Sequence, residues 1–276
     1  MSITITSPGH GSILRLKDLV ELKGSSSSEV ASVKVLSPFG SRVFELNRIP
    51  TNDDGSWRVS VAFNTGGDRT IVAEGLNASG ALVDRTSVKF QLLSYATQVP
   101  IRPLPVGFNQ GLSSAKESAM RSLLGVPGNL TKDCSPVTNS KLKALLVTKD
   151  VGPFKVTGLK PAVGVLERIF SKVQANEPDL YSQLGTAGML CCRAVRGSTT
   201  KFSNHSWGTA IDIKISGVLD SVGDGEAQFG LLKLARYFND EKFFWGAGFS
   251  SLIREDSMHF EVSNELLQDW HRAGII

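Results

Sequence analysis

Two short segments of the chain concentrate the residue types that bind metal ions and catalyse hydrolysis. Residues 203–212 read SNHSWGTAID, and residues 256–261 read DSMHFE. The chain has only four histidines, and two of them lie in these segments beside acidic residues. A hydrolytic zinc site takes three protein ligands from His, Asp or Glu and leaves one position open for water. His205, Asp212 and His259 can supply these three ligands.

Hydrolysis at such a site also needs a base that takes a proton from the attacking water. Asp256 lies three residues before His259. A turn or short loop between them can direct the Asp256 carboxylate towards that water. The sequence therefore predicts Asp256 as the general base beside a metal held by the other three residues.

The two segments also resemble a known enzyme family. Ser203-x-His205-x-x-Gly208-x-Ala210-x-Asp212 is similar to the zinc motif S-x-H-x-x-G-x-A-x-D of D-Ala-D-Ala carboxypeptidases and L-Ala-D-Glu endopeptidases. These enzymes belong to the wider group of LAS-type metallopeptidases. The downstream Trp-Gly and Asp-x-x-His-Phe-Glu segments resemble the second half-site of that group, in the right order. The resemblance extends from about residue 150 to residue 265.

The resemblance implies a role for each of these residues. It makes His205, Asp212 and His259 the ligands of a Zn²⁺ ion and Asp256 the base, a position at which some relatives carry Glu. Glu255 is the rival base, although it is offset from the family spacing. Arg193 stands at the place of an upstream arginine that binds a substrate carboxylate or the developing oxyanion, and Arg196 is the alternative.

Three functions follow from these patterns. The first is a peptidase that cuts stem peptides of bacterial peptidoglycan, as a D-Ala-D-Ala carboxypeptidase or an L-Ala-D-Glu endopeptidase. The second is a zinc hydrolase of the same fold that acts on another peptide or amide. The third is a non-catalytic wall-binding protein whose zinc is structural. Asp256 argues against the third, because a structural site needs no base.

The N-terminal third of the chain and the remainder predict different folds. Residues 1–94 contain short alternating runs separated by polar turns, which predict a β-sandwich similar to bacterial immunoglobulin-like modules. Residues 95–113 are rich in proline and predict a linker. Residues 114–276 mix helical and strand patterns, which predicts an α+β peptidase domain with a small antiparallel sheet. We therefore expect a multidomain protein.

Helices are expected at 114–124, at 141–148, after Pro161 as far as Pro178, at 226–238 and at 264–273. Strands that carry the chemical motifs are expected at 188–193, 210–215 and 259–262.

Composition restricts the partners. The formal net charge of +4 is too weak to predict nucleic-acid binding, and no apolar run is long enough to predict a membrane span. The start MSITITSPGHGS has no basic segment followed by an apolar core, which predicts no ordinary signal peptide. A wall hydrolase of this kind would act outside the cytoplasm after lysis or specialised secretion, as a phage endolysin or a secreted effector does. The N-terminal module would bind wall polymer or a delivery structure, or act as a spacer.

The chain has three cysteines, and adjacent Cys191 and Cys192 are a poor pair for a disulfide. No C-x-x-C motif occurs, so neither a disulfide scaffold nor cysteine ligation of zinc is expected.

Overall fold

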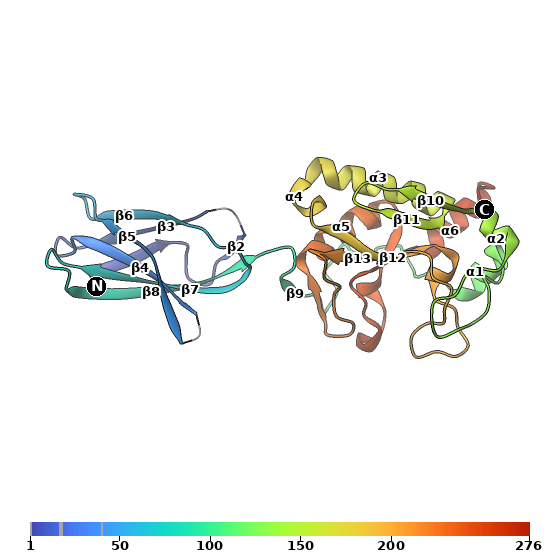
Figure 1. The fold of residues 1–276 in the computed structure, drawn as a ribbon, viewed down its shortest axis with the longest axis horizontal. Coiled ribbons are helices and arrows are strands. Elements are labelled where there is room, and N and C mark those ends of the chain that lie inside the picture. Colours follow the sequence, from blue (N-terminus) through green and yellow to red (C-terminus); the bar gives the residue numbers. More distant parts are fainter. Residues whose placement is uncertain (1, 17–18, 40) are drawn as a thin grey trace. The chain divides into compact units, whose positions relative to one another are not determined.

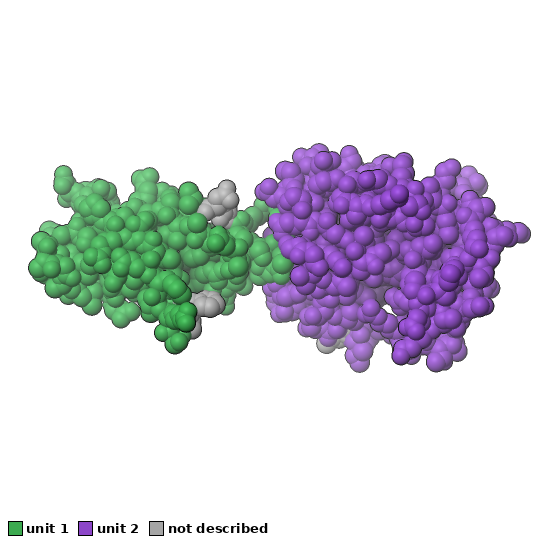
Figure 2. All heavy atoms as spheres, viewed as in Figure 1, with its two compact units in different colours: residues 1–97 green, residues 98–276 purple. Residues whose placement is uncertain are grey.

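The computed structural model describes residues 2–16, 19–39 and 41–276. The chain divides into two compact units, residues 1–97 and residues 98–276, which are coloured separately in Figure 2.

The first unit consists of two β-sheets. One is antiparallel, with the order β1-β3-β6: β1 (Ile3–Ser7), β3 (Val20–Ser26) and β6 (Ser56–Val61). The other has the order β2-β8-β7-β4-β5: β2 (Ile13–Arg15), β8 (Leu82–Leu93), β7 (Gly67–Leu76), β4 (Ser32–Phe39) and β5 (Arg42–Pro50). All neighbours in it are antiparallel except β2 and β8, which are parallel.

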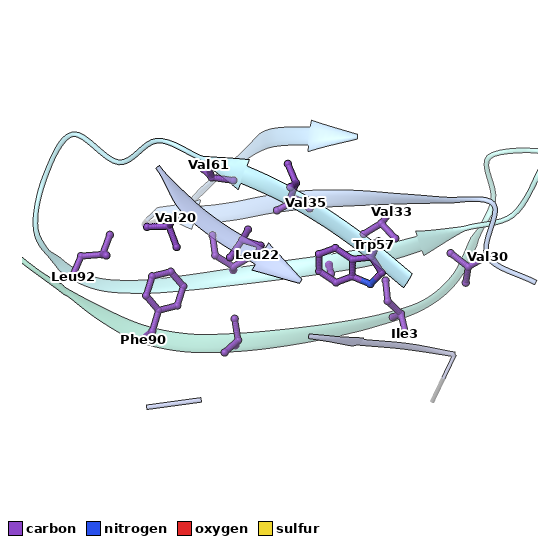
Figure 3. Packing of buried hydrophobic residues seen from close by; sticks show 14 residues of the cluster. Ile3, Val20, Leu22, Val30, Val33, Val35, Trp57, Val61, Phe90 and Leu92 are labelled. Carbon is purple, nitrogen blue, oxygen red and sulfur yellow. The ribbon is translucent and has the colours of Figure 1, made fainter. Parts of the chain in front are cut away.

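A single hydrophobic core joins these two sheets. Alternate residues of β6 are buried, including Trp57 and Val59, while Arg58 between them is exposed. Such alternation buries one face of a strand. Side chains from the other sheet, such as Val33 and Phe90, pack in the same cluster (Figure 3). The first unit is thus β-rich, as expected, and the immunoglobulin-like likeness stays a prediction.

The second unit mixes helices with a small antiparallel sheet (Figure 1). The sheet has the order β12-β13-β16-β15: β12 (Leu184–Gly188), β13 (Ala210–Ile215), β16 (His259–Val262) and β15 (Phe243–Trp245). Two further ribbons pair β10 (Leu146–Asp150) with β11 (Lys155–Leu159), and β9 (Gln98–Pro100) with β14 (Glu226–Gln228). The helices are α1 (Glu117–Leu124), α2 (Ser140–Ala144), α3 (Lys160–Asn176), α4 (Pro178–Tyr181), α5 (Phe229–Asp240) and α6 (Asn264–Arg272). Three 3₁₀ turns complete the unit: η1 (Asn204–Trp207), η2 (Gly246–Gly248) and η3 (Leu252–Arg254).

Aromatic packing fixes this sheet against the helices. Phe238 of α5 stacks on Phe260 of β16 with ring centroids 4.1 Å apart, and Phe170 of α3 meets the edge of Phe238. All three side chains are completely buried. Because neighbouring residues of a strand point to opposite faces, Phe260 anchors one face of β16 and directs His259 to the other.

Several boundaries differ from the sequence expectations. Residues 98–113 lie in the second unit and not in a separate linker, because β9 pairs with β14 and Asn109 bonds to Trp245. The helix expected at 141–148 ends at Ala144, since Leu146 and Val147 pair with β11. The strand expected at 188–193 does not form: β12 ends at Gly188, and Cys192 makes only an isolated β-bridge with Ser135.

The helix expected from residue 226 starts at Phe229, because residues 226–228 form β14. Among the described residues, none of the helices is long and apolar enough to cross a membrane.

Candidate metal centre

Two neighbouring strands place the first two candidate ligands. Asp212 of β13 and His259 of β16 are directly opposite each other in the antiparallel register. Side chains of directly opposed residues emerge on the same face of a sheet. The residues next to them, Ile211 and Phe260, are completely buried on the other face. The alternation that builds the core therefore also brings Asp212 and His259 together.

A tight turn places the third candidate. His205 lies in η1, and Gly208 ends that turn with a φ of 64°. The left-handed conformation favours glycine. A Cβ atom at this position would lie 2.7 Å from the Cα atom of Gly158. Gly208 therefore meets both a conformational and a steric requirement, and it returns the chain into β13 beside His205.

The three side chains converge on one point. The distance from His205 Nε2 to Asp212 Oδ1 is 3.2 Å, and from His205 Nε2 to His259 Nδ1 it is also 3.2 Å. His259 Nδ1 lies 3.1 Å from Asp212 Oδ1. Tetrahedral zinc with bonds of about 2.0–2.1 Å would separate its ligand atoms by about 3.3–3.4 Å. These three atoms therefore have nearly the spacing of ligands around one such ion.

Outer hydrogen bonds orient both imidazoles for this purpose. His205 Nδ1 donates to the backbone oxygen of Met189 at 2.9 Å. His259 Nε2 donates to Glu261 Oε2, also at 2.9 Å. Each ring therefore carries a proton on the outer nitrogen, and in its neutral form it presents a lone pair to the centre. Two lone pairs and a carboxylate oxygen directed at one point form a donor set that a divalent cation fits.

The buried charges of this cluster shift one another's pKa values. Burial alone would raise the pKa of Asp212, but hydrogen bonds from His205 and His259 hold it far below its usual range. Burial alone would lower the pKa of His259, whereas the bonds to Asp212 and Glu261 raise it well above 6.5. A proton and a metal ion therefore compete for Nδ1 of His259.

Asp256 and Glu255 have different environments. Asp256 is half-buried and lines the cleft that contains the three candidate ligands. Its backbone oxygen accepts a hydrogen bond from His259 N at 3.1 Å, which closes a turn between these two residues. Its Oδ1 is buried and has no hydrogen-bond partner within the described chain. Burial raises the pKa of this carboxyl, partly offset by the charge of His259.

Glu255, by contrast, points into the protein. Its side chain is completely buried and accepts hydrogen bonds from the hydroxyl of Ser257 and the backbone nitrogen of Gly225. It is not among the residues that line the cleft. Of the two adjacent carboxylates, only Asp256 is placed to meet a water in the cleft.

The cleft has a volume of about 1070 Å³, and both candidate arginines line it. Arg193 is half-buried, and its Nη1 donates to the backbone oxygen of Ala194 at 3.1 Å. Arg196 is exposed. Its positive charge lowers the pKa of Asp256, although burial and the charges of His259 and Asp212 have larger effects on that pKa. Of the two candidate arginines, Arg196 therefore has the stronger electrostatic interaction with Asp256, the proposed base.

The structure adds two features that the motifs did not predict. Asn204 donates to Glu261 Oε2 at 2.9 Å and so fixes the carboxylate that holds His259. Cys134 and Cys191 form a disulfide that lines the cleft. Adjacent Cys191 and Cys192 do not pair with each other, as expected, but the bond between Cys134 and Cys191 was not predicted. The partner of Cys191 lies 57 residues away, so sequence adjacency gave no signal for it.

The two tryptophans of the motifs are packing residues. Trp207 and Trp245 are completely buried. Their indole nitrogens donate to backbone oxygens of Gly125 and Ser257. Neither ring lines the cleft.

Residues 196–262 match the family model described as D-alanyl-D-alanine carboxypeptidase. The matched segment contains His205, Asp212, Asp256 and His259, whereas Arg193 lies outside it. The similarity to a peptidase family thus covers the segment that carries the candidate metal centre.

The other comparisons add no assignment. No curated protein matches the chain. Among solved structures, an engineered protein is 18% identical with a TM-score of 0.27; the match covers 33% of this chain and 20% of that one. The fibronectin(III)-like modules of Clostridium thermocellum CbhA are 12% identical with a TM-score of 0.26, and the match covers 33% of this chain and 94% of that one. CopC from Methylosinus trichosporium OB3b is 13% identical with a TM-score of 0.24, over 33% of this chain and 92% of that one. Scores of this size are too low to assign a fold.

Proposed function

We propose that this protein is a zinc-dependent peptidase that cuts stem peptides of bacterial peptidoglycan. The observation that carries the proposal is the convergence of His205 Nε2, Asp212 Oδ1 and His259 Nδ1, at 3.1–3.2 Å from one another, on the wall of an open cleft. The similarity of residues 196–262 to the D-alanyl-D-alanine carboxypeptidase family supports the substrate class.

Zinc held by these three residues would polarise the scissile carbonyl and lower the pKa of the attacking water. The protein's own groups do the rest of the chemistry. Asp256 takes the proton from the water and passes it to the leaving amine, since its Oδ1 has no competing partner in the described residues. Arg193 stabilises the negative charge that develops on the carbonyl oxygen. Glu261 holds His259 in the orientation that directs Nδ1 inwards.

The cleft favours catalysis over a structural role for the metal. A structural zinc has four protein ligands and no access for water. Here three candidate ligands cluster in the described chain, and Asp256 lies beside them with a raised pKa. A carboxylate that is poised to accept a proton supports an enzyme. A zinc hydrolase of the same fold acting on another peptide or amide is the alternative that the substrate experiment below separates.

We also propose that the protein works outside the cytoplasm. The Cys134–Cys191 disulfide supports this, because disulfides persist in oxidising surroundings and are rare in the cytosol. The proposed substrate is found in the same place.

The test is digestion of purified peptidoglycan by the zinc-reconstituted protein, with mass spectrometry of the released muropeptides. We expect about one zinc per chain and cleavage of one stem-peptide bond, whose identity distinguishes a carboxypeptidase from an endopeptidase. Zinc content near zero, or muropeptides that remain intact when another peptide or amide is cut, would contradict the proposal.

A further inference from the structure

Lysines and arginines outnumber carboxylates in the cleft by five to four, and the protein itself leaves these cations unpaired. Five basic residues line it: Lys116, Arg193, Arg196, Lys201 and Arg254. Within the described ranges, none of the five belongs to an ion pair.

The carboxylates that line the same cleft are already engaged. Asp212 and Glu261 bond to His259, and Glu117 pairs with Arg121. Asp256 and Glu261 each keep one buried carboxylate oxygen without a hydrogen-bond partner in the described structure, and both residues already have a role in the proposed mechanism. A bound divalent ion would add further positive charge. A cleft with such an excess attracts and orients anionic ligands.

Three of the cations are placed at the surface by two separate segments. Arg196 and Lys201 are exposed residues of a hairpin that Ala194 and Phe202 close through a β-bridge. Val195 N donates to Lys201 O at 2.9 Å within that hairpin. Arg254 is the exposed last residue of η3. Both segments line the cleft, so a ligand that fills it meets cations from each.

Apolar side chains occupy the same rim. Leu219, Val222 and Ile253 are exposed hydrophobic residues, and all three line the cleft. The Val222 segment is fixed beside the base, because it forms a β-bridge with Asp256. A ligand complementary to this rim carries alkyl groups together with negative charge.

From this arrangement, which rests on the proposed peptidase function, we propose that Arg196, Lys201 and Arg254 are specificity residues for an acidic peptide. They bind a substrate carboxylate other than the one nearest the scissile bond, and the apolar rim contacts short alkyl side chains. The cleft thereby discriminates a peptide with free carboxylates from the same peptide with carboxamides.

The test uses the pentapeptide L-Ala-γ-D-Glu-L-Lys-D-Ala-D-Ala and two derivatives, amidated at the D-Glu α-carboxylate or at the C-terminus. We expect one of these amidations to raise KM at least about fivefold while kcat stays within about twofold, as for loss of uniform binding. Arg196→Gln, Lys201→Gln and Arg254→Gln should raise KM for the free peptide and leave KM for that derivative unchanged. The preference should weaken as salt is added, because exposed charges are screened.

The matched control is Lys143→Gln, which removes an exposed cation of α2 that does not line the cleft. It should change neither KM nor zinc content. Equal KM values for all three peptides, or a preference that survives in the triple Gln variant, would overturn the inference.

Binding to Asp256→Asn, measured by calorimetry, separates this inference from the proposed function. If the unsubstituted protein hydrolyses none of the peptides, but Asp256→Asn binds the free peptide more tightly than the amidated one, the peptidase proposal is overturned and the carboxylate site is kept. A protein that hydrolyses all of them without preference overturns the site alone.

Discussion

Glu255 and Asp256 are adjacent in the chain, but their carboxylates lie in different environments. Asp256 lines the cleft, whereas Glu255 is completely buried and bonded to Ser257 and Gly225. In the sequence, only the resemblance to the family's spacing favoured Asp256 over Glu255 as the base. In the structure, the direction of each side chain separates a candidate base from a residue that holds a loop together.

We expect Asp256→Ala to lower kcat by about a hundredfold to ten-thousandfold, the usual effect of losing a general base, while zinc stays bound. The measurement is zinc content together with turnover of a wall peptide. His205→Ala should instead lose metal and activity together. If Asp256→Ala loses its zinc, Asp256 is a ligand and not a base.

The control for this prediction is Glu255→Gln. It should lower thermal stability, because a buried hydrogen-bonding group is disturbed, but retain turnover below its melting temperature. If Asp256→Ala is active while Glu255→Gln is folded but inactive, the base is Glu255 and not Asp256.

We expect zinc to bind more weakly as the pH falls. The bonds to Asp212 and Glu261 raise the pKa of His259, so below that pKa zinc must displace a proton from Nδ1. One displaced proton weakens binding about tenfold per pH unit. Competition with a chelating dye between about pH 5 and about pH 8 measures the slope. A flat profile would mean that His259 is already neutral without metal.

The same raised pKa has the opposite effect on the metal-free fold. Protonated His259 stabilises the folded chain fully below about pH 6.5, and this contribution is lost as the pH rises through the raised pKa. Added zinc should therefore raise the melting temperature most at the alkaline end of the range.

At the scale of elements, η1 and β13 hold the ligands only because the chain reverses between them at Gly208. A Cβ there would meet the backbone of Gly158 and Leu159, at 2.7 Å and 2.9 Å, and these backbone atoms cannot rotate away. The loop that carries His205 is thus packed directly against the segment where β11 leads into α3.

We expect Gly208→Ala to destabilise the fold and to weaken zinc binding. A non-glycine residue in the left-handed conformation costs about 1–2 kcal/mol, and the contact with Gly158 should make the loss larger than this. Gly217→Ala is the matched control, since Gly217 has a φ of +79° but open space around its Cα. Thermal unfolding with and without zinc compares them. Equal losses in both variants would show that the contact with Gly158 is unimportant.

At the scale of the whole molecule, the second unit begins earlier than the proline-rich composition indicated. β9 pairs with β14, and the Asn109 side chain bonds to both backbone groups of Trp245. Trp245 precedes Gly246, whose backbone oxygen accepts from Asp256 N. Residues 98–113 therefore support the segment beside the proposed base.

We expect a fragment of residues 98–276 to fold, bind zinc and hydrolyse soluble muropeptides at a rate close to that of the full chain. A fragment of residues 114–276 should be less stable, because it leaves β14 and Trp245 without these partners. Circular dichroism and zinc content test both. A 98–276 fragment that does not fold would contradict the independence of the two units, while equal stability of both fragments would contradict the role of residues 98–113.

The sequence by itself predicted the candidate chemistry and determined much of the local structure. Two His and two Asp residues at fixed spacings predicted the donor set and the base, and strand alternation predicted β13 and β16 at residues 210–215 and 259–262, where the structure has them. These features depend on residue type and on short-range periodicity, which a single chain displays openly.

Only the tertiary structure decided what lies near in space but far in sequence. It brought Asn204 to Glu261, Cys134 to Cys191, and Asn109 to Trp245. It also placed Arg196 and Arg254 on the same cleft. The reason is physical: such contacts join segments that meet only when the core packs, and that packing, as between Phe238 and Phe260, depends on the shapes of many side chains at once.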